Sequence, residues 1–300
     1  MHTRYTFPCQ QTHFPMSEHS LKQRDEFEQK RNEMIKLNCL VCDHTDFEEI
    51  GQVDRYGFYY PTGICTKCGN VQQIKYYDDE SLALFYSSYF RDVYSDQTPI
   101  ECFDGQVVKG RNILEFSKEF LPKDARILEI GTGAGGIPKI FQDEAGYTAL
   151  GLDFDDRYIE YGRSQGVDIR KGGIEMIKED EKFNLVIVSH VLEHIVTPSK
   201  FLQDIKKILK PKGYIYIEIP SLNSVSQGAY NFDFLNYFQN SHVNHYSVDS
   251  FKRLLHQNGL KAVKNDDFIR SICMVSDARV RVIPPFLGGF RSRQLCSPLD

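Results

Sequence analysis

The 300-residue chain has no long hydrophobic run and no excess of positive charge. Its longest apolar stretches, Leu185–Ser189 and Tyr214–Ile219, are far shorter than the roughly 20 residues that a membrane-spanning helix needs. Residues 1–11 contain no apolar segment of the kind found in secretory signals. The 36 Lys and Arg against 41 Asp and Glu leave a formal net charge of −5, which disfavours a surface that binds nucleic acid or anionic lipid throughout. We therefore expect a cytoplasmic protein with no membrane partner and with nucleic acid disfavoured; the oligomeric state stays open.

The cysteines are too sparse for a disulfide scaffold, which is typical of small secreted chains. Four of the eight form two Cys-x-x-Cys pairs, Cys39/Cys42 and Cys65/Cys68. Two such pairs present four thiolates from two tight turns, as in a tetrahedral zinc site. Because protein would fill all four positions, we predict a structural zinc that stabilises a module too small for a good core of its own. Free cysteines, a redox dithiol, and a site in which His44 replaces one thiolate are the alternatives.

Basic residues are scarce around these cysteines. Between residues 38 and 78 only Arg55, Lys67 and Lys75 are basic. Binding of RNA through a zinc module depends on concentrated positive charge. We therefore expect this module to contact the substrate or the rest of the chain rather than RNA.

Charge, glycine content and hydrophobic periodicity divide the chain into five segments. From Ala125 onward, short apolar strands alternate with helices of roughly 10–15 residues. This alternation predicts an α/β fold with a doubly wound, mostly parallel sheet. A charged stretch without Gly or Pro, Ser17–Lys36, predicts a solvated helix. The predicted segments are 1–36, an N-terminal tail and helix; 37–78, the zinc module; 79–122, a helical connector broken near Thr98; 123–280, the α/β domain; and 281–300, a partly disordered tail.

A glycine-rich turn, Gly131–Gly136 (GTGAGG), follows the strand Ala125–Ile130. It fits both G-x-G-x-x-G, the dinucleotide fingerprint, and E-x-G-x-G-x-G, the corresponding turn of enzymes that use S-adenosylmethionine. Both patterns need glycine because the backbone bends sharply while a ligand lies against it. The glycines alone do not distinguish the two ligands. A P-loop is excluded, since the chain has no Gly-Lys-Ser/Thr.

Acidic residues beside this turn favour the second ligand. A dinucleotide brings a pyrophosphate, whereas S-adenosylmethionine brings an ammonium and a sulfonium that favour a nearby carboxylate such as Glu129. Asp153 ends the second strand, where a carboxylate accepts from ribose hydroxyls, and Phe154 is placed to lie against adenine. The alternatives are a solvent-facing Glu129 and an Asp153 that only caps the following helix.

With these residues the chain resembles the class I S-adenosylmethionine-dependent methyltransferases over about residues 125–265. The stretches 183–194 and 208–214 strengthen the resemblance, which implies S-adenosylmethionine as cofactor. The sequence departs from the family at residues 171–175 (KGGIE), where a glycine replaces the acidic residue that often accepts from adenine. This leaves the adenine contact to Glu175 or to backbone groups near Ile174. The resemblance implies these cofactor-binding residues: Glu129, Gly131, Thr132, Gly133, Gly135, Asp153, Phe154, Ile174 and Ser189.

Residues 190–194 (HVLEH) also match His-x-x-Glu-His, a zinc-peptidase pattern. Two histidines four apart bind one zinc only when they share a helix face and a third ligand is near. Here the segment follows a buried strand directly, and Pro198 interrupts soon after. We therefore favour a strand-end loop beside the cofactor over a peptidase site; a histidine that only packs locally is the further alternative.

A long insertion, residues 221–247, precedes the next predicted helix and is rich in Asn, Phe, Tyr and His. It resembles a segment of zinc-bearing methyltransferases that methylate carbon on deoxysugar nucleotides. That resemblance implies His242 as general base, with His245 and His190 as further candidates, a role that suits imidazole. The alternative is that His242 or His245 merely caps the helix beginning near Val248.

These observations predict a methyltransferase that acts on a small molecule. Sugars and nucleotide sugars are the favoured acceptors. Two other hypotheses stay open: an RNA methyltransferase that uses the zinc module to engage RNA, and a non-catalytic zinc adaptor that retains the fold. The sequence does not decide whether carbon, oxygen or nitrogen would be methylated.

Overall fold

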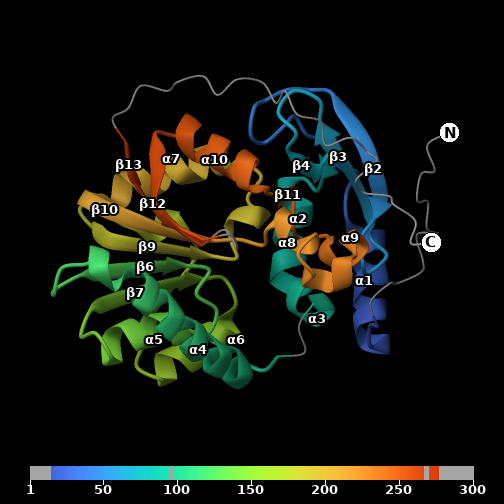
Figure 1. Cartoon of the computed structure of the whole chain (residues 1–300). Helices are drawn as coiled ribbons and strands as arrows, with labels where there is room; N and C mark the ends of the chain where they lie inside the picture. The colour runs from blue at the N-terminus through green and yellow to red at the C-terminus, as the bar shows by residue number, and fades with distance from the viewer. Residues whose placement is uncertain (1–14, 95–96, 267–269, 277–300) are drawn as a thin grey trace.

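A seven-stranded sheet forms the centre of the larger lobe in the computed structural model, which describes residues 15–94, 97–266 and 270–276 (Figure 1). Its order is β12-β13-β10-β9-β6-β7-β8, and only β13 runs antiparallel to its neighbours. The mostly parallel, doubly wound sheet predicted from the sequence is therefore confirmed. Its strands are β6 (Arg126–Ile130), β7 (Thr148–Asp153), β8 (Asp168–Lys171), β9 (Phe183–Ser189), β10 (Leu209–Glu218), β12 (Leu260–Asn265) and β13 (Arg270–Val275).

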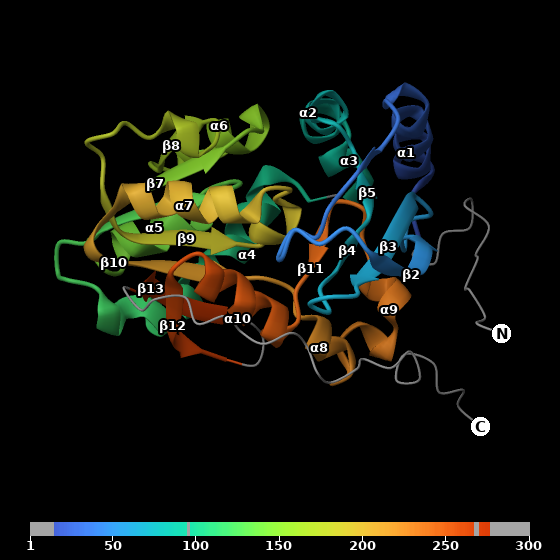
Figure 2. The ribbon, with the colours of Figure 1, turned by 90° about the horizontal axis from the view of Figure 1, so that it is seen from above.

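Helices cover both faces of this sheet. The central strands β6 and β9 are almost wholly buried, which explains their continuous apolar sequences. In Figures 1 and 2 one face carries α4 (Pro99–Ser117), α5 (Gly136–Asp143) and α6 (Asp156–Ser164), and the other carries α7 (Pro198–Ile208) and α10 (Val248–Gln257). Helix α4 begins at the predicted break, because Thr98 and Glu101 form a reciprocal capping box.

The small lobe comprises residues 15–94 and the inserted segment 221–247, at the right of Figure 1. Its core is aromatic, with Phe27, Phe58 and Phe85 fully buried. Its first part contains α1 (Glu18–Lys30), β1 (Ile35–Lys36), β2 (Phe47–Val53), β3 (Tyr59–Cys65), β4 (Val71–Gln73), β5 (Lys75–Tyr76), α2 (Asp79–Ser88) and α3 (Phe90–Tyr94).

The helix predicted over Ser17–Lys36 extends too far. Helix α1 ends at Lys30, and Ile35 and Lys36 instead pair with Tyr76 and Lys75 of β5. The helix is also not fully solvated, because Phe27 lies in the aromatic core. The correction has a physical cause: strand pairing with a segment 40 residues away leaves no local trace in composition.

The inserted segment joins the two lobes. It contains α8 (Leu222–Val225), the turn η4 (Ala229–Phe232), α9 (Phe234–Tyr237) and β11 (Asn244–His245). Strand β11 pairs antiparallel with β4 and completes the sheet β11-β4-β3-β2. The insertion is therefore built into the small lobe before the chain returns to α10.

Within the described ranges no helix combines the length and hydrophobicity needed to cross a bilayer. The predicted C-terminal tail, 281–300, and residues 1–14 of the predicted N-terminal tail lie outside the described residues.

Candidate active site

The glycine turn between β6 and α5 needs glycine for two separate reasons. Gly131, Gly133 and Gly135 have φ values of 72°, 55° and 83°, a region that side chains disfavour. Space is also missing: a Cβ on Gly131 would lie 2.6 Å from Cγ2 of Val191, and one on Gly133 would lie 2.8 Å from Nε2 of Gln106. The turn is therefore pressed between α4 and the loop that follows β9.

Glu129 lies beneath this turn at the end of β6. It is 2% exposed, and the Thr132 hydroxyl donates a 2.5 Å hydrogen bond to its Oε2. Burial raises the pKa of Glu129 to about 8, while Lys109 opposes that rise. A cation bound beside Glu129 would favour the ionised form of this carboxyl group. The solvent-facing alternative is wrong for Glu129.

Asp153 connects the end of β7 to the same turn. Its Oδ2 accepts from the Gly133 N–H at 2.6 Å, and its Oδ1 accepts from the backbone N–H groups of Phe154 and Asp155. Asp155, not Asp153, caps helix α6. The helix-cap alternative for Asp153 is therefore wrong, and the carboxylate lies at the carboxyl edge of the sheet, where ligands of such folds bind.

The other predicted cofactor residues lie along the same edge. Phe154 is 64% exposed directly after β7. Ile174 begins the short turn η2 (Ile174–Met176) after β8, where the Glu175 carboxylate accepts from the Gly173 N–H at 2.7 Å. Ser189 ends β9 and donates to Glu218 Oε2 at 3.0 Å.

Helix α4 supplies two residues, Gln106 and Lys109, that the sequence analysis missed. Gln106 donates from Nε2 to the Thr132 carbonyl at 2.8 Å and accepts from the Gly136 N–H at 3.2 Å. Lys109 Nζ lies 3.5 Å from Ser189 Oγ. No pattern marks these residues in the sequence, because their partners lie later in the chain, in the glycine turn, at the start of α5 and at the end of β9, and their own helix carries no motif.

The histidine-rich loop after β9 is not a peptidase helix. His190 has φ +55°, and η3 (Leu192–His194) is a single short turn, so His190 and His194 do not share a helix face. The strand-end loop favoured from the sequence is what forms. Val191 packs against Gly131, which places this loop directly beside the cofactor turn.

Glu193 lies at the centre of three imidazoles. It is 1% exposed, and its Oε1 lies 3.5 Å from His190 Nδ1, 3.9 Å from His242 Nε2 and 4.0 Å from His194 Nε2. Neither carboxylate oxygen has a hydrogen-bond partner among the described residues. His194 Nδ1 lies 2.8 Å from the Ser241 carbonyl oxygen, so the loops after β9 and before β11 meet here.

His242 and His245 occupy different environments. His242 is 9% exposed with its Nε2 3.3 Å from Gln239 Nε2, and burial lowers its pKa well below the ordinary range. His245 is fully buried, contacts the Tyr60 hydroxyl, and has its pKa lowered to about 3 by burial. The helix-cap alternative is wrong for both, because Ser247 caps α10.

The small lobe fixes the position of His242. The Tyr60 hydroxyl donates to the His242 carbonyl at 2.7 Å, and Gln73 Nε2 donates to the carbonyls of His242 and Asn240. Asp54 accepts from the Asn240 N–H at 2.7 Å. The candidate acceptor side of the active site is thus built on β3 and β4.

The two cysteine pairs come together in the same lobe, where Cys65 ends β3. Cys39 Sγ lies 3.5 Å from Cys68 Sγ, Cys42 Sγ lies 3.6 Å from Cys65 Sγ, and all four sulfurs lie within 4.8 Å of one another. Four sulfurs about 2.3 Å from one zinc would be about 3.8 Å apart, so the geometry fits a tetrahedral ion. His44 contacts Thr66 at 3.2 Å and is not part of this group.

Comparison with known proteins identifies the larger lobe. Residues 104–265, more than half of the chain, match the family model described as a methyltransferase domain. The chain belongs to this methyltransferase family. Its sheet order, with the one antiparallel strand, is that of the Rossmann-like methyltransferase fold.

Individual relatives of this chain are distant. An uncharacterised protein of Methanocaldococcus jannaschii is 30% identical over 118 residues, which cover 39% of this chain and 55% of that protein. A ubiquinone biosynthesis O-methyltransferase of Actinobacillus pleuropneumoniae is 29% identical over 103 residues, covering 30% of this chain and 44% of the relative. The chain thus spans about half the length of these curated relatives. A solved S-adenosylmethionine-dependent methyltransferase from Archaeoglobus fulgidus is 23% identical with a TM-score of 0.45, covering 54% of this chain and 71% of that one.

The family match covers most of the larger lobe and the inserted segment 221–247, but not residues 15–94. It begins within α4, which the sequence analysis had placed in the connector, and it ends with β12. The first part of the small lobe, including the four cysteines, precedes the match. The features that hold His242 from β3 and β4 therefore lie outside the shared methyltransferase domain.

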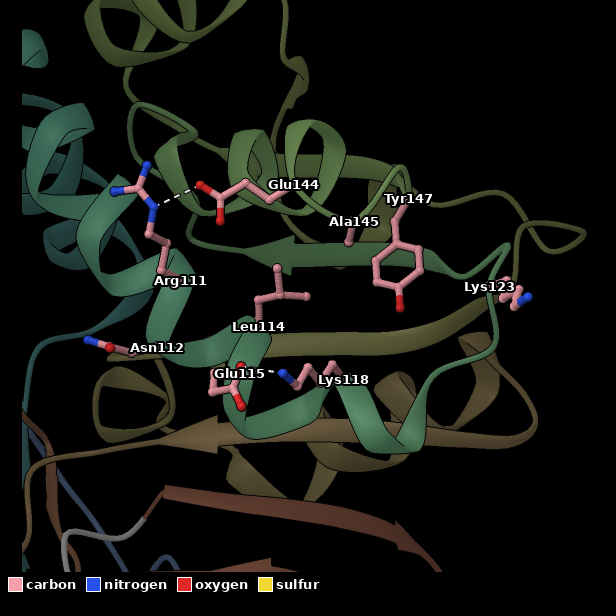
Figure 3. Close-up of a pocket in the computed structure, with 9 residues that line it drawn as sticks. All are labelled: Arg111, Asn112, Leu114, Glu115, Lys118, Lys123, Glu144, Ala145 and Tyr147. Atoms are coloured by element: carbon pink, nitrogen blue, oxygen red, sulfur yellow. Dashed lines mark hydrogen bonds and ion pairs between the residues drawn. The ribbon is translucent and has the colours of Figure 1, made fainter.

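A surface hollow of the methyltransferase, shown in Figure 3, lies away from this site. It forms between the second half of α4 and the end of α5, at the edge where the parallel strands begin. Four of its five charged side chains form two ion pairs, Arg111 with Glu144 at 2.7 Å and Lys118 with Glu115 at 2.5 Å. It lies at the opposite edge from the glycine turn and contributes nothing to the cofactor site. The hollow is lined by Arg111, Asn112, Leu114, Glu115, Lys118, Lys123, Glu144, Ala145 and Tyr147.

Proposed function

We propose that this protein transfers a methyl group from S-adenosylmethionine to a small-molecule acceptor, with sugars and nucleotide sugars as the favoured class. The observation that carries the proposal is the pair of buried carboxylates, Glu129 and Asp153, on either side of the glycine turn. An ammonium or sulfonium placed there would favour the ionised carboxylates and be stabilised by them, whereas a dinucleotide pyrophosphate would gain nothing from Glu129.

Each cofactor residue has a separate task in this proposal. Glu129 faces the amino-acid end of the cofactor, and Asp153 accepts from the ribose hydroxyls while its backbone contacts hold it rigid. Phe154 covers the adenine, which also contacts the backbone near Ile174. The cofactor lies against the backbone of the glycine turn, formed by Gly131, Thr132, Gly133 and Gly135. Ser189, which donates to Glu218, lies next to this surface. Bound S-adenosylmethionine supplies a methyl carbon activated by its sulfonium.

The acceptor lies between the glycine turn and the histidine loops in this proposal, and His242 is the favoured base. The bond from sulfur to methyl breaks, a bond from methyl to the acceptor atom forms, and the acceptor proton passes to imidazole. Burial lowers the pKa of His242 well below its ordinary value, which keeps the imidazole uncharged but also makes it a weaker base than a free histidine. His190, with 44% of its side chain exposed, is the second candidate. His245 is wholly enclosed, and we assign it to packing against Tyr60.

A zinc held by the four cysteines has a structural role in this proposal. All four ligand positions are filled by protein, so no position is open for water or substrate. The ion would join the turn before β2 to the turn between β3 and β4, and through β3 and β4 stabilise the loop that carries His242. The cytoplasm, where thiols stay reduced, is the favoured location.

Calorimetry on the full chain tests the cofactor assignment. We expect S-adenosylmethionine and its demethylated product to bind, and nicotinamide dinucleotide to be unable to displace them. A dinucleotide seated at the glycine turn that the sulfur compounds fail to displace would overturn the proposal. Transfer of a labelled methyl group to a panel of nucleotide sugars then tests the acceptor class.

An RNA acceptor and a non-catalytic adaptor are separated by two further measurements. Tight RNA binding with a steep salt dependence would favour RNA. A biological activity that survives both His242→Ala and Glu129→Ala would favour the adaptor.

A further inference from the structure

Glu193 is a buried carboxylate whose side-chain oxygens both lack a hydrogen-bond partner among the described residues. Buried charges in folded proteins are paired or bind metals, because an isolated one is costly. The groups that surround Glu193 are imidazoles rather than Lys or Arg. An uncharged imidazole compensates a carboxylate only weakly, so something positive is missing from this arrangement.

The spacing of these groups suits a shared metal ion. Glu193 Oε1 lies 3.9 Å from His242 Nε2 and 4.0 Å from His194 Nε2, too far for hydrogen bonds. One ligand atom from each of Glu193, His194 and His242 lies within 4.8 Å of the others. Ligands bound at about 2.0–2.2 Å to one ion lie about 3–4 Å apart, so small side-chain adjustments bring all three onto one cation.

Outer contacts hold the ligands in the required state. His194 donates from Nδ1 to the Ser241 carbonyl at 2.8 Å, which leaves its Nε2 lone pair directed toward Glu193. Such a hydrogen bond to the second ring nitrogen is typical of metal-binding histidines. The Val243 N–H donates to the Glu193 carbonyl at 2.9 Å and fixes the two loops against each other. Gln239 donates from Nε2 to His242 Nε2 at 3.3 Å, so the ring lone pair lies on that nitrogen, and a cation would take the place of this hydrogen bond.

We propose that Glu193, His194 and His242 bind a first-row divalent cation at the junction of the two lobes. Two imidazoles and one carboxylate are the ligands preferred by zinc, cobalt and iron(II) ions, with calcium and magnesium disfavoured. His190 lies 3.5 Å from the same carboxylate oxygen and is placed to join as a further ligand. This site is distinct from the four cysteines and uses two residues of the peptidase-like pattern in a different arrangement.

The site has a consequence that rests on the proposed function. A cation bound to His242 Nε2 occupies the lone pair that would accept the acceptor proton. Metal binding and base catalysis by His242 therefore exclude each other, and the cation inhibits methyl transfer.

Cobalt(II) binding to the full chain, with its cysteine site already filled by zinc, tests the inference. We expect native mass spectrometry to show one cobalt ion beyond the zinc. We also expect d–d absorption bands without the sulfur charge-transfer bands that cysteine ligands would give. Glu193→Gln and His194→Ala should each lose this cobalt, while His256→Ala, a histidine on α10 outside the cluster, should retain it.

Several outcomes would overturn the site. These are no cobalt beyond the cysteine site, cobalt with sulfur charge-transfer bands, or equal cobalt binding in wild type, Glu193→Gln and His194→Ala. Affinity for S-adenosylhomocysteine checks that each variant is folded. If the variants are unstable, the absorption spectrum of the cobalt-loaded wild type decides whether the site exists. The cobalt-binding measurements do not require methyl transfer, so their outcome does not depend on whether the proposed function is correct. Where methyl transfer is found, excess zinc should slow wild type more than Glu193→Gln.

Discussion

The glycine turn and the histidine loops face the same edge of one sheet, but they are built in different ways. The turn is formed by neighbouring residues, Glu129–Gly136, with Asp153 supplied by the next strand. His242 is held instead by Tyr60 and Gln73, residues more than 160 positions earlier in the chain. The cofactor side is therefore intrinsic to the larger lobe, whereas the acceptor side depends on the small lobe. The two sides should respond differently to the same perturbation.

Loss of the four-cysteine site should separate the two sides most strongly. In Cys39→Ser/Cys68→Ser we expect methyl transfer to fall below detection, because β4 and the paired β11 lose their support. Structural zinc sites contribute on the order of 10 kcal/mol to small modules. The affinity for S-adenosylhomocysteine should change by less than about tenfold. Calorimetry and a labelled-methyl assay on the same preparation measure both effects.

Cys102→Ala and Cys273→Ala are the cysteine controls for that double variant. Both thiols lie outside the four-cysteine group, and both substitutions should leave the zinc content near wild type. Activity is compared through Cys273→Ala, because Cys102 lies beside the glycine turn. A double variant that keeps full activity would show that the acceptor side does not depend on this module.

Removal of the proposed base should act on the acceptor side alone. His242→Ala should lower kcat by about 10²–10⁴-fold, the usual contribution of a general base. Cofactor affinity should stay unchanged, since no predicted cofactor contact involves this residue. His190→Ala is tested in parallel. If it lowers kcat more than His242→Ala does, His190 is the base. Equally small decreases in both variants would argue against either histidine as the base.

The difference between the two sides also explains what the sequence could predict. Glu129, the glycines and Asp153 were predicted because strand, turn and spacing are local features. Gln106 was missed, since its contact with the Thr132 carbonyl arises only when α4 folds onto the turn. Glu193 was seen only inside a peptidase-like pattern, because its meeting with His242 depends on how two distant loops pack.

Secondary structure shows the same limit. The capped start of α4 at Pro99 was predictable from Thr98 and the following proline. The end of α1 was not, because Ile35 and Lys36 leave the helix to pair with β5. Local chemistry determined the first boundary, and a distant strand determined the second.

A pair of glycine variants tests the cofactor side at intermediate strength. Gly131→Ala forces a side chain into positive φ and places its Cβ 2.6 Å from Val191 Cγ2. We expect the affinity for S-adenosylhomocysteine to fall by about 10- to 100-fold. Gly146→Ala is the control, because it shares a positive φ of 68° but meets no atom within 4 Å. It should lose about 1–2 kcal/mol of stability through backbone strain and keep its cofactor affinity.

Proton linkage at Glu129 gives the smallest and most specific effect. Burial raises the pKa of Glu129 to about 8, above its ordinary 4.5, so at pH 7 the free protein carries this group mostly protonated. The folded chain therefore binds more protons than the unfolded chain between these values, and the contribution of Glu129 to stability falls as pH rises from about 4.5 to 8. A cofactor ammonium beside Glu129 favours the carboxylate, so binding should release a proton at pH 7. Affinity should then rise by at most about tenfold per pH unit between pH 6 and 8.

Calorimetry of S-adenosylhomocysteine binding in two buffers of different ionisation enthalpy measures that proton directly. Glu129→Gln keeps the shape of the side chain but has no proton to release. Subtracting the proton release measured for this variant from that of the wild type therefore removes any contribution from ionisation of the ligand. Equal proton release in both proteins would mean that the cofactor ammonium does not lie beside Glu129. In that case the carboxyl group only supports the turn through Thr132, and the charge argument for S-adenosylmethionine over a dinucleotide would be lost, because a carboxylate at the position of Asp153 accepts from ribose hydroxyls of either ligand.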